Sequence, residues 1–373
     1  MILVLNSGSS SLKCRLVDPA RPAAARGMVV ERIGAAGGPP DHGAALERVV
    51  DALDLSRQEL RAVGHRVVHG GDRFREPTVV DDAVARAIEE LTPLAPLHNP
   101  ANLRGIAVAR RLRPDVPHVA VFDTAFHATL PAVAATYAID AELARRHGVR
   151  RYGFHGTSCR YVVRRTAALL DRPVSELNLV VLHLGNGASA TAVQGGRSVE
   201  TSMGLSPLEG LVMGTRCGDL DPAVPGHLRR VAGLDADAAD DVLWHRSGLV
   251  GLCGDNDMRS VLARRAAGDA DAALAFDVYC HRIRKYVGAY HAVLGRLDAV
   301  VFTAGVGEHA AEVRAAALAG LDHWGIAVDP HQNAVPANEP RVISPAGTPV
   351  PICVIPTDEE LGIAQEVTDL LSP

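Results

Sequence analysis

The stretch ILVLNSGSSSLKCRLV, residues 2–17, consists of two apolar runs joined by a turn of glycine and serine. The same pattern returns at residues 179–193 as LVVLHLGNGASATAV, with Gly187 in the place of Gly8. Apolar runs on either side of a glycine turn predict a β-hairpin. The turn presents backbone N–H groups and hydroxyls to an anion, of which phosphate is the commonest. The repetition therefore predicts two related halves that hold one nucleotide.

Composition indicates a globular protein of two domains that acts on small molecules. The chain has 373 residues, of which 47% are hydrophobic and 22% charged, and its net charge is -5. This acidic balance argues against nucleic acid and membrane surfaces as partners. The six cysteines have no Cys-x-x-Cys spacing, so we expect reduced thiols rather than disulfides. Because no signal peptide pattern and no bilayer-length apolar run is present, we expect a cytoplasmic protein.

Strands and helices alternate along the rest of the chain, which favours an α/β fold. Strands are expected at residues 62–69, 116–122, 299–303 and 352–355, and helices at 44–53, 82–91, 100–112, 159–170, 271–294 and 358–371. Residues 19–43 are expected to form a loop or a short edge strand. Asn99 is expected to cap the helix that Pro100 starts, and Thr357 with Glu360 to form a capping box at the last helix.

Several candidate ligand-binding groups follow the ends of predicted strands, where open α/β sheets bind ligands. Asp123 follows the strand at 116–122, and Gly305 with Gly307 forms a turn that lets a ligand approach the backbone. Glu359 follows the last strand, where a carboxylate can hold magnesium. The glycine pair has a plainer explanation, since such glycines often serve only a tight turn, whereas Glu359, unlike Glu360, has no expected part in the helix cap. Residues 202–222, rich in Gly and Pro, are expected to line a binding site.

Three common site types are disfavoured by the sequence. Neither a Walker phosphate loop nor a Gly-x-Gly-x-x-Gly turn after the first strand is present. His65, His69 and His98 lack further ligands at zinc-like spacing, so they are expected to be structural or to bind substrate.

Taken together, nine motifs resemble the acetate kinase (acetokinase) family, in order and over essentially the whole chain. They are NSGSSSLK at 6–13, GHRVVHGG at 64–71, LHNP at 97–100, FDTAFH at 122–127, YGFHGTS at 152–158, HLGNG at 183–187, GTRCGD at 214–219, FTAGVGE at 302–308 and PTDEE at 356–360. The resemblance implies a duplicated ribonuclease H-like (actin-like ATPase) fold with domains at 1–150 and 151–373, an interdomain cleft and a closing helix that packs back on the first domain. It also implies a homodimer.

The activity implied by the resemblance is reversible transfer of the γ-phosphoryl group of ATP to acetate, giving acetyl phosphate and ADP, with Mg²⁺ or Mn²⁺. A carboxylate is already ionised at neutral pH, so it needs no general base. Catalysis then requires only positioning of the reactants and neutralisation of their charges. The bidentate guanidinium groups of Arg66 and Arg216, one from each half of the chain, suit the acid and the phosphoryl oxygens.

The resemblance also assigns residues to these tasks. The implied catalytic residues are Arg66, Asp123, His155, Asn186 and Arg216. The implied acid-binding residues are Asn6, Arg66, Val68, Leu97, Phe154 and Pro207, and the metal ligands Asn6, Asp123 and Glu359. The implied nucleotide-binding residues are Ser11, Lys13, His183, Gly185, Asn186, Gly187, Asp257, Met258, Arg259, Gly305, Val306 and Gly307, with Ser9 also near the transferred phosphoryl group.

The chain departs from the family pattern at a few positions. Cys159 and His309 stand where histidine and asparagine are expected, Met258 where an aromatic residue is common, and residues 17–62 are compact. Cys159, His309 and Met258 bear on adenine packing and nucleotide choice, whereas the compact region bears on the edge of the first domain or the dimer contact. Two alternatives stay open at this point: a propionate or butyrate kinase of the same family, and a nucleotide-binding module without catalysis.

Overall fold

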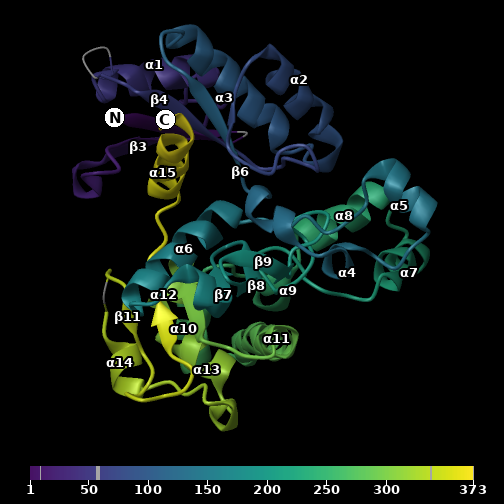
Figure 1. The fold of residues 1–373 in the computed structure, drawn as a ribbon. Coiled ribbons are helices and arrows are strands. Elements are labelled where there is room, and N and C mark those ends of the chain that lie inside the picture. The colour runs from purple at the N-terminus through teal and green to yellow at the C-terminus, as the bar shows by residue number, and fades with distance from the viewer. Residues whose placement is uncertain (9, 56–58, 337, 373) are drawn as a thin grey trace. The chain divides into compact units, whose positions relative to one another are not determined.

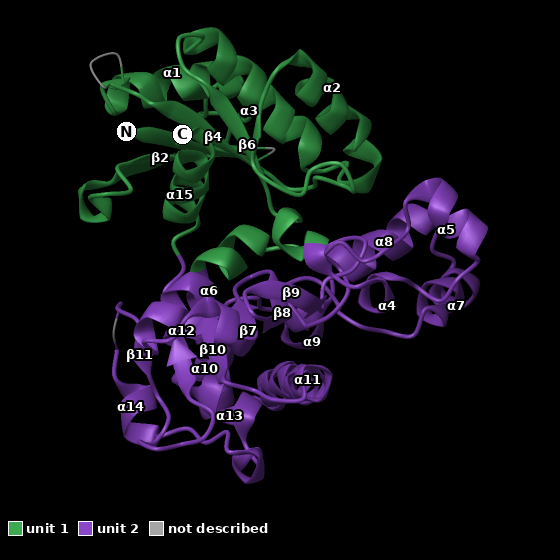
Figure 2. Cartoon of the chain, in the orientation of Figure 1, with its two compact units in different colours: residues 1–128, 154–161, 358–373 green, residues 129–153, 162–357 purple. Residues whose placement is uncertain are grey.

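The computed structural model describes residues 1–372 except 9, 56–58 and 337, and the chain forms two compact units (Figure 2). Unit 1 comprises residues 1–128, 154–161 and 358–373, and unit 2 comprises residues 129–153 and 162–357. The units interleave along the sequence, since helix α6 (Gly156–Leu169) begins in unit 1 and ends in unit 2. The division into domains 1–150 and 151–373 stays a prediction.

Each unit contains a mixed sheet of six strands, and strands are drawn as arrows in Figure 1. The two sheets share one topology. The strands of unit 1 are β1 (Ile2–Ser7), β2 (Ser11–Val17), β3 (Arg26–Glu31), β4 (Ala62–Val67), β5 (Thr78–Val79) and β6 (His118–Phe122), in the order β3-β2-β1-β4-β6-β5. Those of unit 2 are β7 (Asn178–Leu184), β8 (Ala188–Gln194), β9 (Arg197–Thr201), β10 (Ala299–Thr303), β11 (Arg341–Val342) and β12 (Ile352–Val354), in the order β11-β12-β10-β7-β8-β9.

The shared topology confirms the expected duplicated α/β fold. In unit 1, β1, β2 and β3 are antiparallel neighbours, and β4 and β6 continue the sheet parallel to β1. In unit 2, β7, β8 and β9 repeat the antiparallel part, and β10 and β12 repeat the parallel part. The two repeated sequence stretches thus form hairpins at equivalent places. Their turns close by backbone bonds from Gly8 N to Ser11 O (2.8 Å) and from Gly185 N to Gly187 O (3.0 Å).

Helices cover both faces of the unit 1 sheet. They are α1 (His42–Ala52), α2 (Asp82–Glu90), α3 (Asn99–Leu112) and α15 (Glu359–Leu371), with the start of α6. On one face, Leu3 and Leu5 of β1 pack in a buried cluster with Leu46 of α1. On the other face, Gly64 of β4 makes room for α15, since a Cβ atom there would lie 2.9 Å from Ile363. The last helix therefore belongs to the core of unit 1.

Unit 2 carries most of the helices. They are α4 (Ala132–Ala135), α5 (Ala141–His147), α7 (Ala223–Ala232), α8 (Ala236–His245), α9 (Gly248–Cys253), α10 (Met258–Ala266), α11 (Ala270–Leu294), α12 (Ala304–His309), α13 (Ala311–Leu318) and α14 (Pro330–Ala334). The four from α7 to α10 lie in a region for which the sequence pattern predicted no element. The long α11 packs against β7 and β8, and α12 follows β10 directly. None of the helices within the described residues is long and apolar enough to cross a membrane.

Two predicted helix caps are wrong. The helix α3 begins at Asn99 itself, and the Asn99 amide instead bonds to the backbone of His69, accepting from N–H at 3.2 Å and donating to C=O at 3.1 Å. The N-cap of α15 is Asp358, whose carboxylate accepts from Leu361 N at 3.0 Å. Glu360 forms an ion pair with Lys13 rather than a capping box. In each case the side chain that the local pattern assigned to the helix end instead interacts with a residue distant in sequence.

Candidate active site

In unit 1, one arginine and three oxygen-bearing side chains meet at the carboxyl ends of the parallel strands. Arg66 lies near the end of β4 and Asp123 directly follows β6. The Nε of Arg66 donates to Oδ1 and Oδ2 of Asp123 at 3.0 and 3.1 Å, and its Nη2 donates to Oδ2. Its Nη1 donates to Oδ1 of Asn6 at 3.4 Å, and Oε2 of Glu359 lies 4.0 Å from its Nε. These four predicted site residues therefore form one cluster.

Burial makes the charges of this cluster depend on one another. The Asp123 side chain is only 2% exposed, so its carboxylate relies on the Arg66 guanidinium for compensation. Burial opposes the charge of Arg66, but the charges of Asp123 and Glu359 outweigh it and raise the pKa of Arg66 above its ordinary value. Burial also raises the pKa of Glu359, against the attraction of Arg66. A divalent cation would stabilise the ionised form of Glu359.

The position of His155 is determined by a close backbone contact beside Asp123. The N–H of Gly156 donates to the carbonyl oxygen of Asp123 at 2.9 Å, and a Cβ atom at position 156 would lie 2.1 Å from that oxygen. Only glycine fits there. His155 has a φ of 59°, in the left-handed region that residues other than glycine seldom adopt. Such strain is typical of functional sites.

The predicted acid-binding residues of unit 1 differ in exposure. Phe154 is buried, its ring packs edge to face with that of His69 at 5.5 Å, and Val68 is half-buried. His127 holds Phe154 in place, because its Nε2 lies 2.9 Å from the Phe154 carbonyl oxygen. Burial lowers the pKa of His127 to about 4, so the ring is neutral and donates there. Leu97, in contrast, is 61% exposed in unit 1.

In unit 2, Arg216 is a cation without an anionic partner among the residues that the structure describes. Its Nη1 donates to the carbonyl oxygen of Pro207 at 2.8 Å, and its guanidinium lies over the Trp244 ring at 5.8 Å. No carboxylate among the described residues forms an ion pair with it, and burial lowers its pKa. A half-buried guanidinium without a counter-ion is suited to bind an anion.

Unit 2 also contains a cavity of about 430 Å³, a volume suited to a small ligand. Seven predicted nucleotide-binding residues line it: Gly185, Asn186, Asp257, Met258, Arg259, Gly305 and Val306. His309, one of the departures from the family pattern, lines it too. A Cβ atom at Gly305 would meet no other atom within 4 Å, so this glycine faces open space. The predicted glycine turn is instead the first turn of α12, which follows β10 without a loop. The backbone at Gly305 is nevertheless accessible.

Other predicted nucleotide-binding residues lie outside this cavity. His183 is buried within β7, Gly187 closes the β7–β8 turn, and Gly307 packs against Phe302. Ser11 and Lys13 lie on β2 in unit 1, and Ser9 lies outside the described residues. Five lining residues were not predicted: Leu249, Asn256, Leu262, Tyr279 and Ala310. Spacings of four residues on α10 (Met258 to Leu262) and from Val306 to Ala310 could have indicated two of them; nothing local marks the others.

The oxygen donors of unit 1 suit magnesium better than zinc. Mg²⁺ is usually held by one or two carboxylates with substrate phosphates and water, and Asp123, Glu359 and Asn6 offer two carboxylates and an amide oxygen. Within the described part of the chain, no three His, Cys, Asp or Glu side chains are close enough to hold a metal alone. His65 instead stacks on His118 and bonds to it at 2.9 Å. Burial lowers the pKa of both, which fits a structural pair.

Known proteins resemble this chain over nearly its whole length. Residues 1–365 match the model of the acetokinase family. An acetate kinase of Streptomyces griseus is 59% identical over 395 residues, covering 99% of this chain and 96% of the relative. The crystal structure of Porphyromonas gingivalis acetate kinase has a TM-score of 0.95 and 38% identity, covering 100% of this chain and 99% of that one. A propionate kinase from Francisella tularensis has a TM-score of 0.91 and 40% identity, covering 98% of each chain. This chain belongs to the acetokinase family.

Proposed function

We propose that this protein is an acetate kinase that transfers the γ-phosphoryl group of ATP to acetate, reversibly, giving acetyl phosphate and ADP. The full-length identity of 59% to an acetate kinase supports the substrate. The observation that carries the chemistry is Arg216, a half-buried guanidinium without a carboxylate partner among the described residues. Its unit also holds a cavity suited to a nucleotide.

In the proposed reaction, an acetate oxygen attacks the γ-phosphorus and the bond to the β-phosphate oxygen breaks. Acetate is ionised at neutral pH, because carboxyl groups titrate near about 4, and so needs no base. Catalysis is then positioning and neutralisation of repelling charges. We assign Arg66 and Arg216 to the acid and the phosphoryl oxygens. His155 and Asn186 are assigned as hydrogen-bond donors to the transition state, each worth roughly 3 kcal/mol.

Magnesium is the cofactor that we propose for the unit 1 cluster. Asp123, Glu359 and Asn6 would hold it, and when bound it would neutralise charge on the phosphate oxygens. The geometry supports this assignment, because Asp123, Asn6 and Glu359 all place oxygen atoms beside the Arg66 guanidinium. Arg66 bonds to Asp123 and would keep that carboxylate oriented.

ATP is the nucleotide that we propose for the unit 2 cavity, where the seven predicted residues and His309 meet. From family membership we further propose a homodimer in the cytoplasm. The acid is selected by apolar contact with Val68, Leu97, Phe154 and Pro207. Because one methylene changes binding by only about 1 to 3 kcal/mol, propionate should react more slowly than acetate, and butyrate more slowly still.

The test compares acyl phosphate formation from acetate, propionate and butyrate with ATP and magnesium. We expect kcat/KM to fall in that order. A lower value for acetate than for both longer acids would instead indicate a propionate or butyrate kinase. No acyl phosphate from any acid, with ADP still bound in calorimetry, would indicate a nucleotide-binding module without catalysis.

A further inference from the structure

The segment 202–222 of unit 2 carries Pro207 and Arg216 but contains no helix or strand. Regular backbone ladders therefore do not determine its shape. Isolated backbone hydrogen bonds, such as those from Gly214 N to Asn186 O and from Cys217 N to Leu243 O, hold it together with side-chain contacts. Two sets of these contacts matter here, one at residues 202–209 and one at residues 210–219.

The first set centres on Arg151, which connects both ends of residues 202–209. Its Nη1 donates to the carbonyl oxygens of Ser202 and Met203 at 3.1 and 3.2 Å. Its Nη2 donates to Oε1 of Glu209 at 2.6 Å. The Arg151 side chain is only 15% exposed, so these bonds form largely away from water. The guanidinium thus acts as a brace across the short stretch that contains Pro207.

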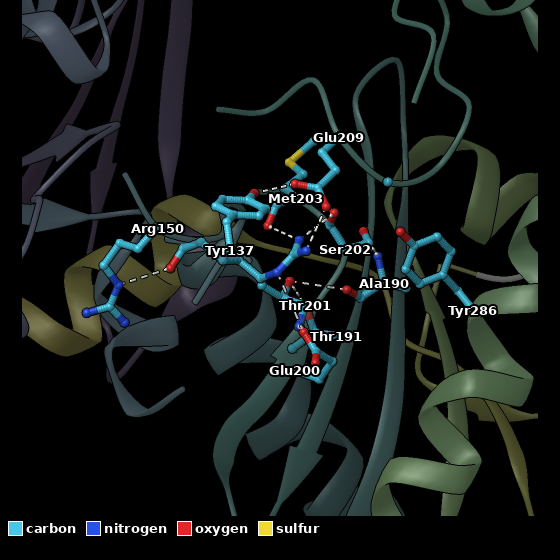
Figure 3. A network of polar contacts seen from close by, with 12 residues as sticks. Tyr137, Arg150, Ala190, Thr191, Glu200, Thr201, Ser202, Met203, Glu209 and Tyr286 are labelled. Atoms are coloured by element: carbon cyan, nitrogen blue, oxygen red, sulfur yellow. Dashed lines mark hydrogen bonds and ion pairs between the residues drawn. The ribbon is translucent and has the colours of Figure 1, made fainter. Parts of the chain in front are cut away.

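Tyr137 completes this brace from the other side of Glu209. Its hydroxyl donates to Oε2 of Glu209 (Figure 3). The same hydroxyl accepts from the N–H of Leu205 at 3.1 Å. A Cβ atom at Gly204 would lie 1.9 Å from Oε2 of Glu209 and 2.0 Å from the Tyr137 hydroxyl. The backbone at Gly204 therefore lies so close to Tyr137 and Glu209 that a residue with a side chain would not fit there.

The second set closes residues 210–219 into a loop that contains Arg216. The N–H of Gly210 donates to Oδ1 of Asp219 at 2.9 Å, and the N–H of Asp219 donates to the Gly210 carbonyl at 3.0 Å. The Tyr286 hydroxyl donates to Oδ2 of Asp219 at 2.9 Å. Arg282 Nη1 donates to the carbonyl oxygens of both Gly210 and Asp219.

One hydrogen bond connects residues 202–209 with the guanidinium of Arg216. Arg216 Nη1 donates to the carbonyl oxygen of Pro207 at 2.8 Å, and Pro207 lies within the stretch that Arg151 braces. We propose that Tyr137, Arg151 and Glu209 are positioning residues, which hold the Pro207 carbonyl where it orients Arg216. This inference rests on the proposed role of Arg216. Neither Tyr137 nor Glu209 lines the cavity of unit 2, so their effect should spare nucleotide binding.

A purely structural role for the network makes different predictions. A buried ion pair that only stabilises unit 2 would change the unfolding midpoint but not kcat of the folded protein. A positioning role lowers kcat, because a displacement of about 1 Å in a group that must meet the transition state costs up to about a hundredfold in rate. A lower kcat with unchanged nucleotide affinity therefore indicates a positioning role, whereas an unchanged kcat indicates a structural role.

The experiment uses the full chain with Tyr137→Phe and Glu209→Gln as test variants. Asp298→Asn is the matched control, because its carboxylate accepts from Arg172 Nη1 and from Asn178 N, both at 2.9 Å, and lies outside segment 202–222. Turnover of ATP with acetate is measured below the unfolding midpoint of each variant, and ADP affinity by calorimetry. Tyr137→Phe removes a single oxygen, so it tests the inference even if Glu209→Gln does not fold.

We expect Tyr137→Phe to lower kcat at least tenfold while the Kd of ADP changes less than threefold, and Asp298→Asn to keep kcat within twofold. In an Arg216→Lys background, Tyr137→Phe should cost less than twofold more, because both changes act through one guanidinium. Unchanged kcat in folded Tyr137→Phe, or a full tenfold further loss in the Arg216→Lys background, overturns the inference. If the unmodified protein forms no acyl phosphate, the proposed function fails and the inference falls with it.

Discussion

Replacing Arg216 by alanine should abolish turnover but leave the free energy of unfolding nearly unchanged. Replacing Arg66 by alanine should abolish turnover and also lower the free energy of unfolding. Arg216 has no ion-pair partner among the described residues, and burial disfavours its charge. The change removes one hydrogen bond to Pro207, worth about 0.5–1.5 kcal/mol, and a contact with the Trp244 ring worth roughly 0.5–1 kcal/mol. It also removes a desolvated cation, which offsets these losses. We expect the free energy of unfolding to change by no more than about 1 kcal/mol.

Arg66→Ala differs because it leaves the Asp123 carboxylate 2% exposed and without its cation. Breaking a buried pair in this way costs about 3–5 kcal/mol. At roughly 2–4 °C per kcal/mol for units of this size, the midpoint should fall by about 6–20 °C, against at most about 4 °C for Arg216→Ala.

Calorimetric unfolding, acyl phosphate formation and ADP binding measured on both variants test this contrast. Arg216→Ala should lose turnover, keep ADP affinity and keep its unfolding midpoint. An equal fall of the unfolding midpoint in the two variants would refute the view that Arg216 forms no ion pair with a carboxylate of the described residues. Turnover by Arg216→Ala at the unmodified rate would refute its assigned role.

Three further predictions concern pH, the cavity and the metal. Because burial lowers the pKa of His127 to about 4, only the unfolded chain gains this proton as pH falls below about 6.5, so this ring should account for a loss of roughly 3 kcal/mol between pH 6.5 and 4. His65 and His118 add to the total loss. The difference between urea midpoints with and without His127→Gln across this range measures the share of His127. Gly305→Leu, which fills open space, should weaken ADP binding at least tenfold in calorimetry without lowering the midpoint. Glu359→Gln should raise the magnesium concentration for half-maximal turnover about tenfold.

Each of these predictions has an outcome that contradicts it. Equal slopes of stability against pH with and without His127→Gln would show that this ring titrates normally. Unchanged ADP affinity in Gly305→Leu would place the nucleotide elsewhere. An unaltered magnesium requirement in Glu359→Gln would remove Glu359 from the metal site.

Much of the fold and part of the candidate site could be predicted because their signals are local. The two hairpins, the strand that leads into Asp123 and the strand before Gly305 are determined by neighbours within a few residues, through alternation, glycine turns and helical periodicity. The long helix α11 follows the same logic, and the structure confirms these elements.

Only the tertiary structure decided which side chains meet. Glu360 pairs with Lys13 from the opposite end of the chain, and Tyr137 meets Glu209 across 72 positions of sequence. Tyr279 lines the cavity from a helix whose pattern indicates only core. Local propensity says what backbone a residue favours, but the partner of a polar side chain depends on which strands and helices the fold brings together. Such pairings therefore exist only once the chain has folded.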